Sequence, residues 1–182
     1  SRGLRPDLKL GDVRGNVETR VGKVARGEYD ATVLAAAGLS RIGLMAEGHM
    51  LDPGLVAFML EGPAWLSAAA QGAIGIEVRA GDERVAALLA SVHHAPSATC
   101  CAIEREFLRA CSAGCQAPVG ALARPAALGS YEFHVGVFSL DGSRAVKDNV
   151  ALGGDWTDGV RTFAKDVLAR GGRDILAQAR VQ

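Results

Sequence analysis

The chain has 182 residues, of which 49% are apolar and 22% are charged, and this composition can bury a hydrophobic core and excludes a disordered tail. Twenty basic residues balance twenty acidic ones, so association with nucleic acid or an anionic membrane driven by net charge is not expected. No apolar run reaches the ~18–20 residues of a membrane-spanning helix, and the first residues do not have the basic-plus-apolar pattern of a leader, so secretion is not expected. Its length corresponds to one medium domain or two small ones.

The first 66 residues combine short helical and strand-like patterns. Residues 18–25 are predicted to form a short helix that ends at Gly27. The apolar run 32–34 favours a short strand, and the alanines after it can begin a helix. Residues 55–60 (LVAFML), bracketed by proline and glycine, are interpreted as one or two helical turns. This mixture is typical of an α/β layer, but it holds too few strands to cover its own helices.

The middle of the chain alternates a strand pattern with helical patterns. Branched side chains at every second position predict a strand over 71–79. Asp82 is predicted to cap an amphipathic helix, which breaks at Ala95-Pro96-Ser97. A second helix is predicted over 98–111, and Gly114 ends that helical stretch. The apolar stripe of this second helix is formed by Ile103, Phe107 and Cys111.

The last third of the chain is typical of a small α+β unit. Its three strand candidates are 119–123, 131–140 and 145–152. Asp141-Gly142 between the last two strands predicts a hairpin turn. Asp155 is predicted to cap a helix that Gly171-Gly172 ends, and a short helix over 175–179 follows. The apolar stripe of the longer helix is formed by Trp156, Val160, Phe163 and Val167.

Several arginines lie beside glycine-containing turns. Arg14 and Arg20 flank the turn before the helix at 18–25, Lys23 and Arg26 extend the basic stretch, and Arg41 follows a second such turn. Guanidinium groups bind carboxylates and phosphates in fixed, bidentate geometry. The pattern therefore points to a ligand with several anionic groups, with an ordinary solvated helix face as the alternative.

The four cysteines cluster in one stretch of the chain. They are Cys100, Cys101, Cys111 and Cys115. This clustering is unlike a secreted disulfide scaffold and indicates reduced thiols in a cytoplasmic-type compartment. Cys115, between a predicted helix and a predicted strand, is expected on a turn, where a thiolate can serve as a nucleophile or an attachment point. A structural turn cysteine and a zinc site with His93 and His94 remain alternatives, although paired short-spaced ligands are lacking. On the helix before it, Glu104 and Arg105 are candidates for a site, with a surface pair as the favoured interpretation.

Four segments together resemble the porphobilinogen deaminase, or hydroxymethylbilane synthase, family. They are RGNVETRVGKVARGEYDATVLAAAGLSRIGL (14–44), AAQGAIGIEVR (69–79), IEREFL (103–108) and GCQAPVGALA (114–123). The resemblance implies an α/β and α+β fold: part of a doubly wound domain like that of periplasmic binding proteins, then a small domain with a three-stranded antiparallel sheet and helices. It assigns 1–66 to the second α/β domain, 67–92 to a segment crossing back to the first α/β domain, and 95–182 to the C-terminal cofactor-attachment domain.

The resemblance also implies a reaction and a cofactor. The family condenses four porphobilinogen molecules head to tail into a linear tetrapyrrole and releases ammonia, on a dipyrromethane cofactor joined by a thioether to a cysteine. By motif match that cysteine is Cys115. Arg14, Arg20 and Arg41 would bind carboxylates of cofactor and substrate, and Gln71-Gly72 would line the cleft. The implied protein is a cytoplasmic monomer when intact, with porphobilinogen as its small-molecule partner and with neither nucleic acid nor membrane as a partner.

Departures from the family pattern limit what is expected of these residues alone. Ala113-Gly114 replaces the usual Gly-Gly before the cysteine, and Ser67 to Gly72 (SAAAQG) replaces P-A-x-G-Q-G. The family's catalytic aspartate lies in the N-terminal domain, which these 182 residues lack, so no aspartate here is assigned that role. We therefore expect no hydroxymethylbilane from this chain alone. The alternatives are a truncated, non-catalytic polycarboxylate-binding or interaction domain, and a thiol- or metal-based redox module.

Overall fold

A computed structural model describes residues 5–114 and 116–179. The chain forms two compact units, one from Leu8 to Glu61 and one that contains Gly62 onward together with the residues before Leu8. We call them the α1–α2 unit and the sheet unit. The sequence-based boundaries at 66 and 92, and the assignment of 67–92 to another domain, stay predictions.

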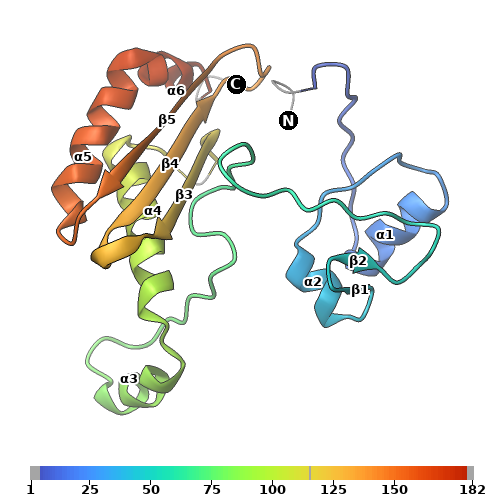
Figure 1. Ribbon diagram of the computed structural model, residues 1–182, viewed down its shortest axis with the longest axis horizontal. Helices are drawn as coiled ribbons and strands as arrows, with labels where there is room; N and C mark the ends of the chain where they lie inside the picture. Colours follow the sequence, from blue (N-terminus) through green and yellow to red (C-terminus); the bar gives the residue numbers. More distant parts are fainter. Residues whose placement is uncertain (1–4, 115, 180–182) are drawn as a thin grey trace. The chain divides into compact units, whose positions relative to one another are not determined.

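The sheet unit is built on three antiparallel strands in the order β3-β4-β5 (Figure 1). The strands are β3 (Val119–Pro125), β4 (Tyr131–Phe138) and β5 (Ala145–Leu152). All three predicted strands are confirmed. Strand β3 is longer than expected by two residues, and strand β4 is shorter than expected by two residues. The predicted hairpin turn is also confirmed: the Asp141 carboxylate accepts hydrogen bonds from the Ser139 hydroxyl at 2.6 Å and the Ser143 amide at 3.0 Å, and Gly142 takes a φ of 77°.

Helices α4 (Ala95–Ala110), α5 (Trp156–Val167) and α6 (Arg173–Ala179) complete the sheet unit. Helix α4 begins three residues before its predicted start. Pro96 lies in the first turn, where the missing amide hydrogen costs nothing and the fixed φ suits a helix. The His94 side chain caps this end by accepting from the Ser97 amide.

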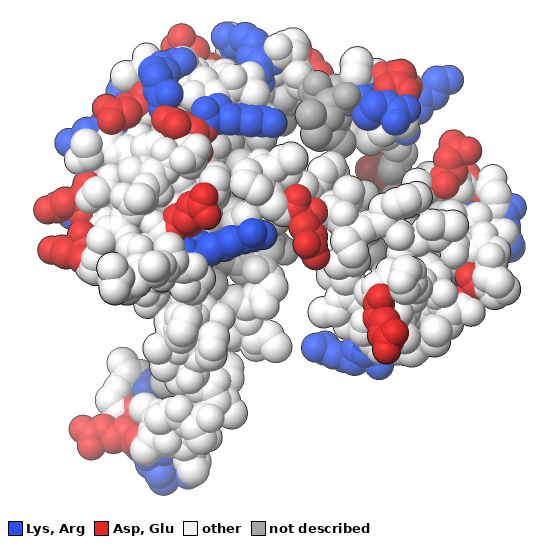
Figure 2. All heavy atoms as spheres, viewed as in Figure 1, with Lys and Arg blue, Asp and Glu red and all other residues white. Residues whose placement is uncertain are grey.

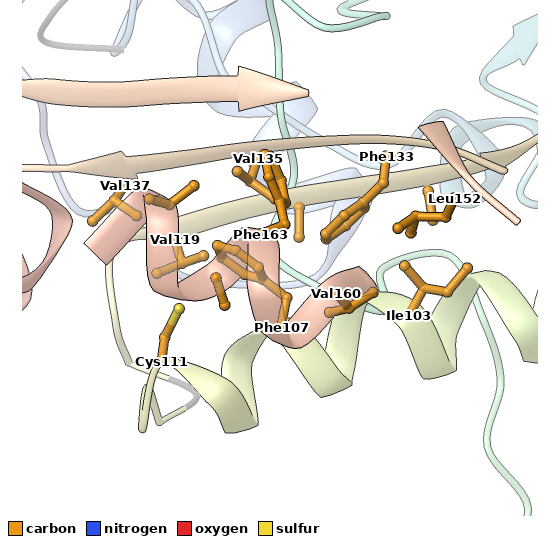
Figure 3. Close-up of a cluster of buried hydrophobic side chains, with 14 of the residues drawn as sticks. Ile103, Phe107, Cys111, Val119, Phe133, Val135, Val137, Leu152, Val160 and Phe163 are labelled. Carbon is orange, nitrogen blue, oxygen red and sulfur yellow. The ribbon is translucent and has the colours of Figure 1, made fainter. Parts of the chain in front are cut away.

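The core of the sheet unit lies between the sheet and helices α4 and α5 (Figure 3). The predicted stripes of both helices face this core, with Ile103, Phe107, Val160 and Val167 fully buried. The rings of Phe107 and Phe133 meet edge to face, with centroids 5.6 Å apart. These contacts supply most of the apolar burial that holds the unit together.

Short elements fill the connections. They are α3 (Glu83–Leu89), η1 (Ala90–Val92), η2 (Ala127–Gly129) and the π-type turn η3 (Leu168–Gly172). The predicted cap of α3 is confirmed, because the Asp82 carboxylate accepts from the Val85 amide at 3.0 Å. Within the described residues no single helix is long and apolar enough to cross a membrane. The stretch 83–92 and helix α4 pass that test only when they are taken together across a 104° bend.

The α1–α2 unit contains α1 (Val17–Ala25), α2 (Ala36–Arg41) and the short strands β1 (Met45–Ala46) and β2 (His49–Met50). The Asn16 side chain caps α1 by accepting from the Thr19 amide at 2.8 Å. Gly27, with a φ of 74°, follows the end of the helix as predicted. The buried apolar side chains described for this unit are Leu39 and Met45.

Two predicted strands and one predicted helical segment are wrong for this structure. Residues 32–34 and 73–79 form no strand ladder, 71 and 72 lie in a turn, and 55–60 belong to no helix. Ile74 is 86% exposed and Phe58 is 83% exposed. The apolar pattern is present, but a strand forms only where a neighbouring strand completes its hydrogen bonds, and no other described segment pairs with these residues.

Candidate functional site

Helix α1 positions the first two candidate arginines. Arg20, one turn into the helix, donates from Nε to the Gly15 carbonyl at 2.9 Å, which holds its side chain over the turn that precedes α1. Gly15 takes a φ of 117°, in the region that favours glycine. Arg14 is exposed just before this turn and makes no hydrogen bond or ion pair with any other described residue.

Helix α2 carries the third candidate arginine. A side chain at Gly38 would contact Val17 Cγ2 at 3.8 Å, so the start of α1 lies close to α2. Arg41 is the last residue of α2 and is exposed. It too has no hydrogen-bond or ion-pair partner among the described residues. The α1–α2 unit thus presents at least two guanidinium groups whose donors are available to a ligand.

The other two basic residues of this stretch are engaged locally. Arg26 pairs with Glu28 at 2.8 Å, and the Lys23 ammonium lies 5.9 Å from the centre of the Tyr29 ring. The Tyr29 hydroxyl in turn donates to the Asp12 carbonyl at 2.9 Å, which ties the segment leading to Arg14 to the end of α1. Lys23 and Arg26 are therefore weaker ligand candidates than Arg14 and Arg41.

Gln71 and Gly72 lie in the sheet unit, where the chain leaves the edge of β3. Both are exposed. Ala70 and Gly72 have positive φ values of 59° and 79°, which makes a sharp turn here. From Gln71 to Val78 no backbone hydrogen bond joins the chain to another described residue. The segment is extended and its backbone groups are open to a partner.

Cys115 lies outside the described residues. Among the described residues on either side of it, α4 ends at Ala110 and β3 begins at Val119. Its neighbours Gly114 and Gln116 are exposed, and the Gly114 carbonyl accepts from the Ala117 amide at 3.0 Å.

The other cysteines differ from a reactive thiolate. Burial raises the pKa of the Cys111 thiol to about 11. Burial also raises the pKa of Cys100 and of Cys101, with the Glu104 charge as the second cause. A raised pKa keeps these thiols protonated and poorly nucleophilic at neutral pH. Among the described residues, no group of three or more histidine, cysteine, aspartate or glutamate side chains could hold a metal ion.

The interpretation of Glu104 as a surface residue is wrong. Its carboxylate is buried, 7% exposed, and accepts from the Ala70 amide at 2.6 Å and the Ala123 amide at 2.9 Å. Burial raises the pKa of Glu104, while its hydrogen bonds from Ala123 and Ala70 oppose the rise. A signal was present in the sequence: Glu104 follows Cys100 by four residues and precedes Phe107 by three, the spacing of one helix face.

Glu106 is a second buried carboxylate that sequence reasoning missed. It pairs with Arg109 and, at 2.8 Å, with Arg161 of α5. The Arg161 hydrogen bond lowers the pKa of Glu106, with the charges of both arginines as further causes. This ion pair joins α4 to α5.

On the face of the sheet unit drawn in Figure 2, acidic and basic side chains are interspersed and form no patch of a single sign.

The candidate residues are thus carried by two separate units. Arg14, Arg20 and Arg41 belong to the α1–α2 unit, whereas Gln71 and Gly72 belong to the sheet unit. Chemically, the first unit offers donors for carboxylates or phosphates, and the second offers an extended segment that leaves a folded sheet.

Comparisons with known proteins identify the class. Residues 1–87 match the family model "Porphobilinogen deaminase, dipyromethane cofactor binding domain", and residues 98–165 match "Porphobilinogen deaminase, C-terminal domain". The chain is 42% identical over 181 residues to the porphobilinogen deaminase of Thermus thermophilus, covering 97% of this chain and 56% of that protein. It is 42% identical over 180 residues to that of Moorella thermoacetica, covering 98% and 54%.

The chain belongs to the porphobilinogen deaminase family. It spans about half the length of the curated relatives that it matches. The matched half contains the segments with Arg14, Arg20, Arg41, Gln71 and Gly72, and the resemblance seen in the sequence is confirmed at the level of the family.

Proposed function

We propose that this chain is the C-terminal part of a hydroxymethylbilane synthase. The reaction condenses four porphobilinogen molecules head to tail into a linear tetrapyrrole with release of ammonia. When bound, the dipyrromethane cofactor supplies the pyrrole unit from which the product is extended. Activity requires the N-terminal half of the enzyme, which carries the family's catalytic aspartate, and the intact enzyme is a cytoplasmic monomer.

The donor set on the α1–α2 unit fits a dipyrromethane with acidic side arms. Arg14 and Arg41 are exposed and have no partner within the described part of the chain, so their guanidinium groups can bind carboxylates without first breaking another bond. Arg20 uses Nε for the Gly15 carbonyl and keeps its terminal nitrogens for a ligand. We propose that these three arginines orient the acetate and propionate groups of cofactor and substrate.

The sheet unit is proposed to carry the cofactor through a thioether to Cys115. Such an attachment needs a thiol that can reach solvent, and the exposed flanking residues Gly114 and Gln116 support this assignment. Cys111 is unsuited, because it is buried in the core and its pKa is raised to about 11. Gln71 and Gly72 are proposed to line the cleft beside the cofactor.

The α1–α2 unit is proposed to be part of a doubly wound domain like those of periplasmic binding proteins. Residues 32–34 and 55–60 are extended, and Val33 and Phe58 are strongly exposed. These are the properties of strands whose neighbours come from elsewhere in a sheet. We propose that the N-terminal half of the enzyme supplies those neighbours.

One observation carries the proposal: Arg14 and Arg41, which are exposed and have no partner among residues 5–114 and 116–179, occupy the segment that matches the model of the cofactor-binding domain. The test is the intact mass of the protein expressed with its N-terminal half, as purified and after peptide mapping. We expect added mass equal to two linked pyrroles on the peptide that contains Cys115. The matched variants are Cys115→Ser, which should lack the adduct, and Cys111→Ser, which should keep it.

The same preparation gives the activity test. The protein with both halves should convert porphobilinogen to hydroxymethylbilane, and the 182-residue chain alone should not. Porphobilinogen turnover by the 182-residue chain would contradict the expected need for the N-terminal half. Absence of any adduct and of any turnover from the two-half protein would favour the non-catalytic polycarboxylate-binding domain.

A further inference from the structure

Leu66 packs on a notch formed by two paired glycines. Gly120 of β3 and Gly136 of β4 stand opposite each other in the sheet. A side-chain carbon at Gly120 would come within 2.6 Å of Leu66 Cβ, and one at Gly136 would come within 3.2 Å of Leu66 Cδ1. Real Cβ atoms do not approach another carbon as closely as 2.6 Å, so the glycine at position 120 is what allows the segment at Leu66 to lie against the sheet. At Gly136 a Cβ would meet the Phe138 ring first, at 2.5 Å, and Leu66 only tightly.

The segment after Leu66 then runs beside the free edge of β3 for a few residues. The Ala121 amide donates to the Ser67 carbonyl at 2.9 Å, as it would to a fourth strand. Two residues further along β3, the Ala123 amide donates to the Glu104 carboxylate instead. The Ala70 amide donates to the other oxygen of the same carboxylate. Glu104 therefore occupies the place where the segment diverges from the strand.

Burying this carboxylate is costly, and no cation in the described part of the chain offsets the cost. No described lysine, arginine or histidine forms an ion pair with Glu104, although Glu106, two residues later, has two arginine partners. An apolar residue at position 104 would avoid the cost but would leave the Ala70 and Ala123 amides without this acceptor.

We propose that Glu104 is a positioning residue that holds the 66–70 segment to β3 and α4, so that the chain leaves the edge of β3 at Gln71-Gly72. The Ala70 amide is fixed directly before this pair, and from Gln71 to Val78 the backbone is bonded to no other described segment. Through Glu104, helix α4 fixes where the proposed cleft segment starts.

The inference deepens the proposed function, since Gln71 and Gly72 belong to the proposed cleft. Its test needs neither cofactor nor substrate: amide hydrogen exchange, resolved by residue, on the 182-residue chain and its variants. In Glu104→Ala we expect the Ala70 and Ala123 amides to exchange about tenfold to a hundredfold faster, as for the loss of a hydrogen bond to a charged group. A failed activity assay would leave this result unaffected.

Two further variants distinguish the positioning role of Glu104 from a general effect on the stability of the fold. Glu104→Gln keeps one acceptor oxygen, so it should restore slow exchange at one of the two amides and leave the other fast. Glu106→Ala removes an equally buried carboxylate from the same helix and should leave the Ala70 amide within about twofold of its original rate. Unchanged exchange at both amides in Glu104→Ala would overturn the proposal. So would an equal acceleration throughout β4 and β5.

If Glu104→Ala does not fold, Gly120→Ala tests the same arrangement with the carboxylate intact. The added methyl group displaces Leu66 and should accelerate the Ala121 amide, which donates to Ser67, about tenfold relative to the amides of β4, while the Ala70 amide stays slow because Glu104 still accepts from it. Equal acceleration of the Ala121 and Ala70 amides in a folded Gly120→Ala variant would overturn the proposal.

Discussion

The two units of the chain show what completes a fold. The sheet unit buries sixteen apolar side chains in one cluster, whereas the described part of the α1–α2 unit buries Leu39 and Met45. Both units have well-formed helices, so local helical signals do not explain the difference. What the α1–α2 unit lacks is a partner for its extended apolar segments, and a domain is stable only when each apolar face packs against another layer.

The largest effect is expected when a phenylalanine in each of the two units is replaced by alanine. Phe107→Ala leaves a cavity in the core of the sheet unit and should lower the free energy of unfolding by about 3–5 kcal/mol. Phe58→Ala, at an exposed position of the α1–α2 unit, should change it by about 0.5 kcal/mol or less. Urea unfolding followed by tryptophan fluorescence measures the first loss, because Trp156 packs on the core of the sheet unit. Amide exchange within α1 and α2 measures the second, because Phe58 belongs to the other unit. Equal losses from the two variants would break the comparison.

A smaller effect concerns the helix starts of the two units. The Asn16 side chain accepts from the amide and hydroxyl of Thr19, whereas Asp155 stands at the start of α5 without a side-chain hydrogen bond. Asn16→Ala should therefore cost about 0.5–2 kcal/mol of helix stability, and Asp155→Ala should cost less. Amide exchange within α1 and α5 measures the two losses separately. A greater loss of helix stability in Asp155→Ala than in Asn16→Ala would show that the hydrogen bond from Thr19 to the Asn16 side chain does not determine how strongly the cap stabilises the helix.

The smallest expected effect is on the pH dependence of the sheet unit. The pKa of Glu104 is raised by burial, so the folded state holds this proton more tightly than the unfolded state. The unfolding free energy should thus fall as pH rises from about 4.5 through the raised pKa. The pKa of Glu106 is lowered chiefly by Arg161, so its contribution is present above about 4.5 and is lost as pH falls through the lowered pKa.

Glu104→Gln and Glu106→Gln should therefore change the slope of stability against pH in opposite directions. Thermal unfolding between about pH 3 and pH 8 checks this, with each variant compared to the original chain. Slopes that change in the same direction would show that one of the two carboxylates is not in the environment described.

The sheet unit was largely predictable because its signals are local and mutually consistent. The strand candidates 119–123, 131–140 and 145–152 became β3, β4 and β5, Asp141-Gly142 predicted the hairpin, and the spacing of Ile103 and Phe107 predicted the buried face of α4. The strand prediction at 71–79 failed for a non-local reason. The residue pattern was correct, but a strand also needs a neighbour, which no local pattern can supply.

The candidate site was predictable in residue type but not in arrangement. Arginines beside glycine turns were found in the sequence, yet only the structure separates Arg14 and Arg41, which have no described partner, from Arg26, which pairs with Glu28. Glu104 was missed because a charged residue on a helix is usually solvated. Its acceptance of amides from positions 70 and 123 depends on contacts between distant parts of the chain.

The extended segment from Ala73 to Arg79 has a consequence for solubility. Unpaired backbone groups beside exposed Ile74, Ile76 and Val78 form a template on which another chain can add as a strand. Glu77 and Arg79 interrupt that template with charge, which opposes stacking of identical segments. The charged pair thus acts as a gatekeeper, and its replacement by neutral residues would turn an open edge into a site of aggregation.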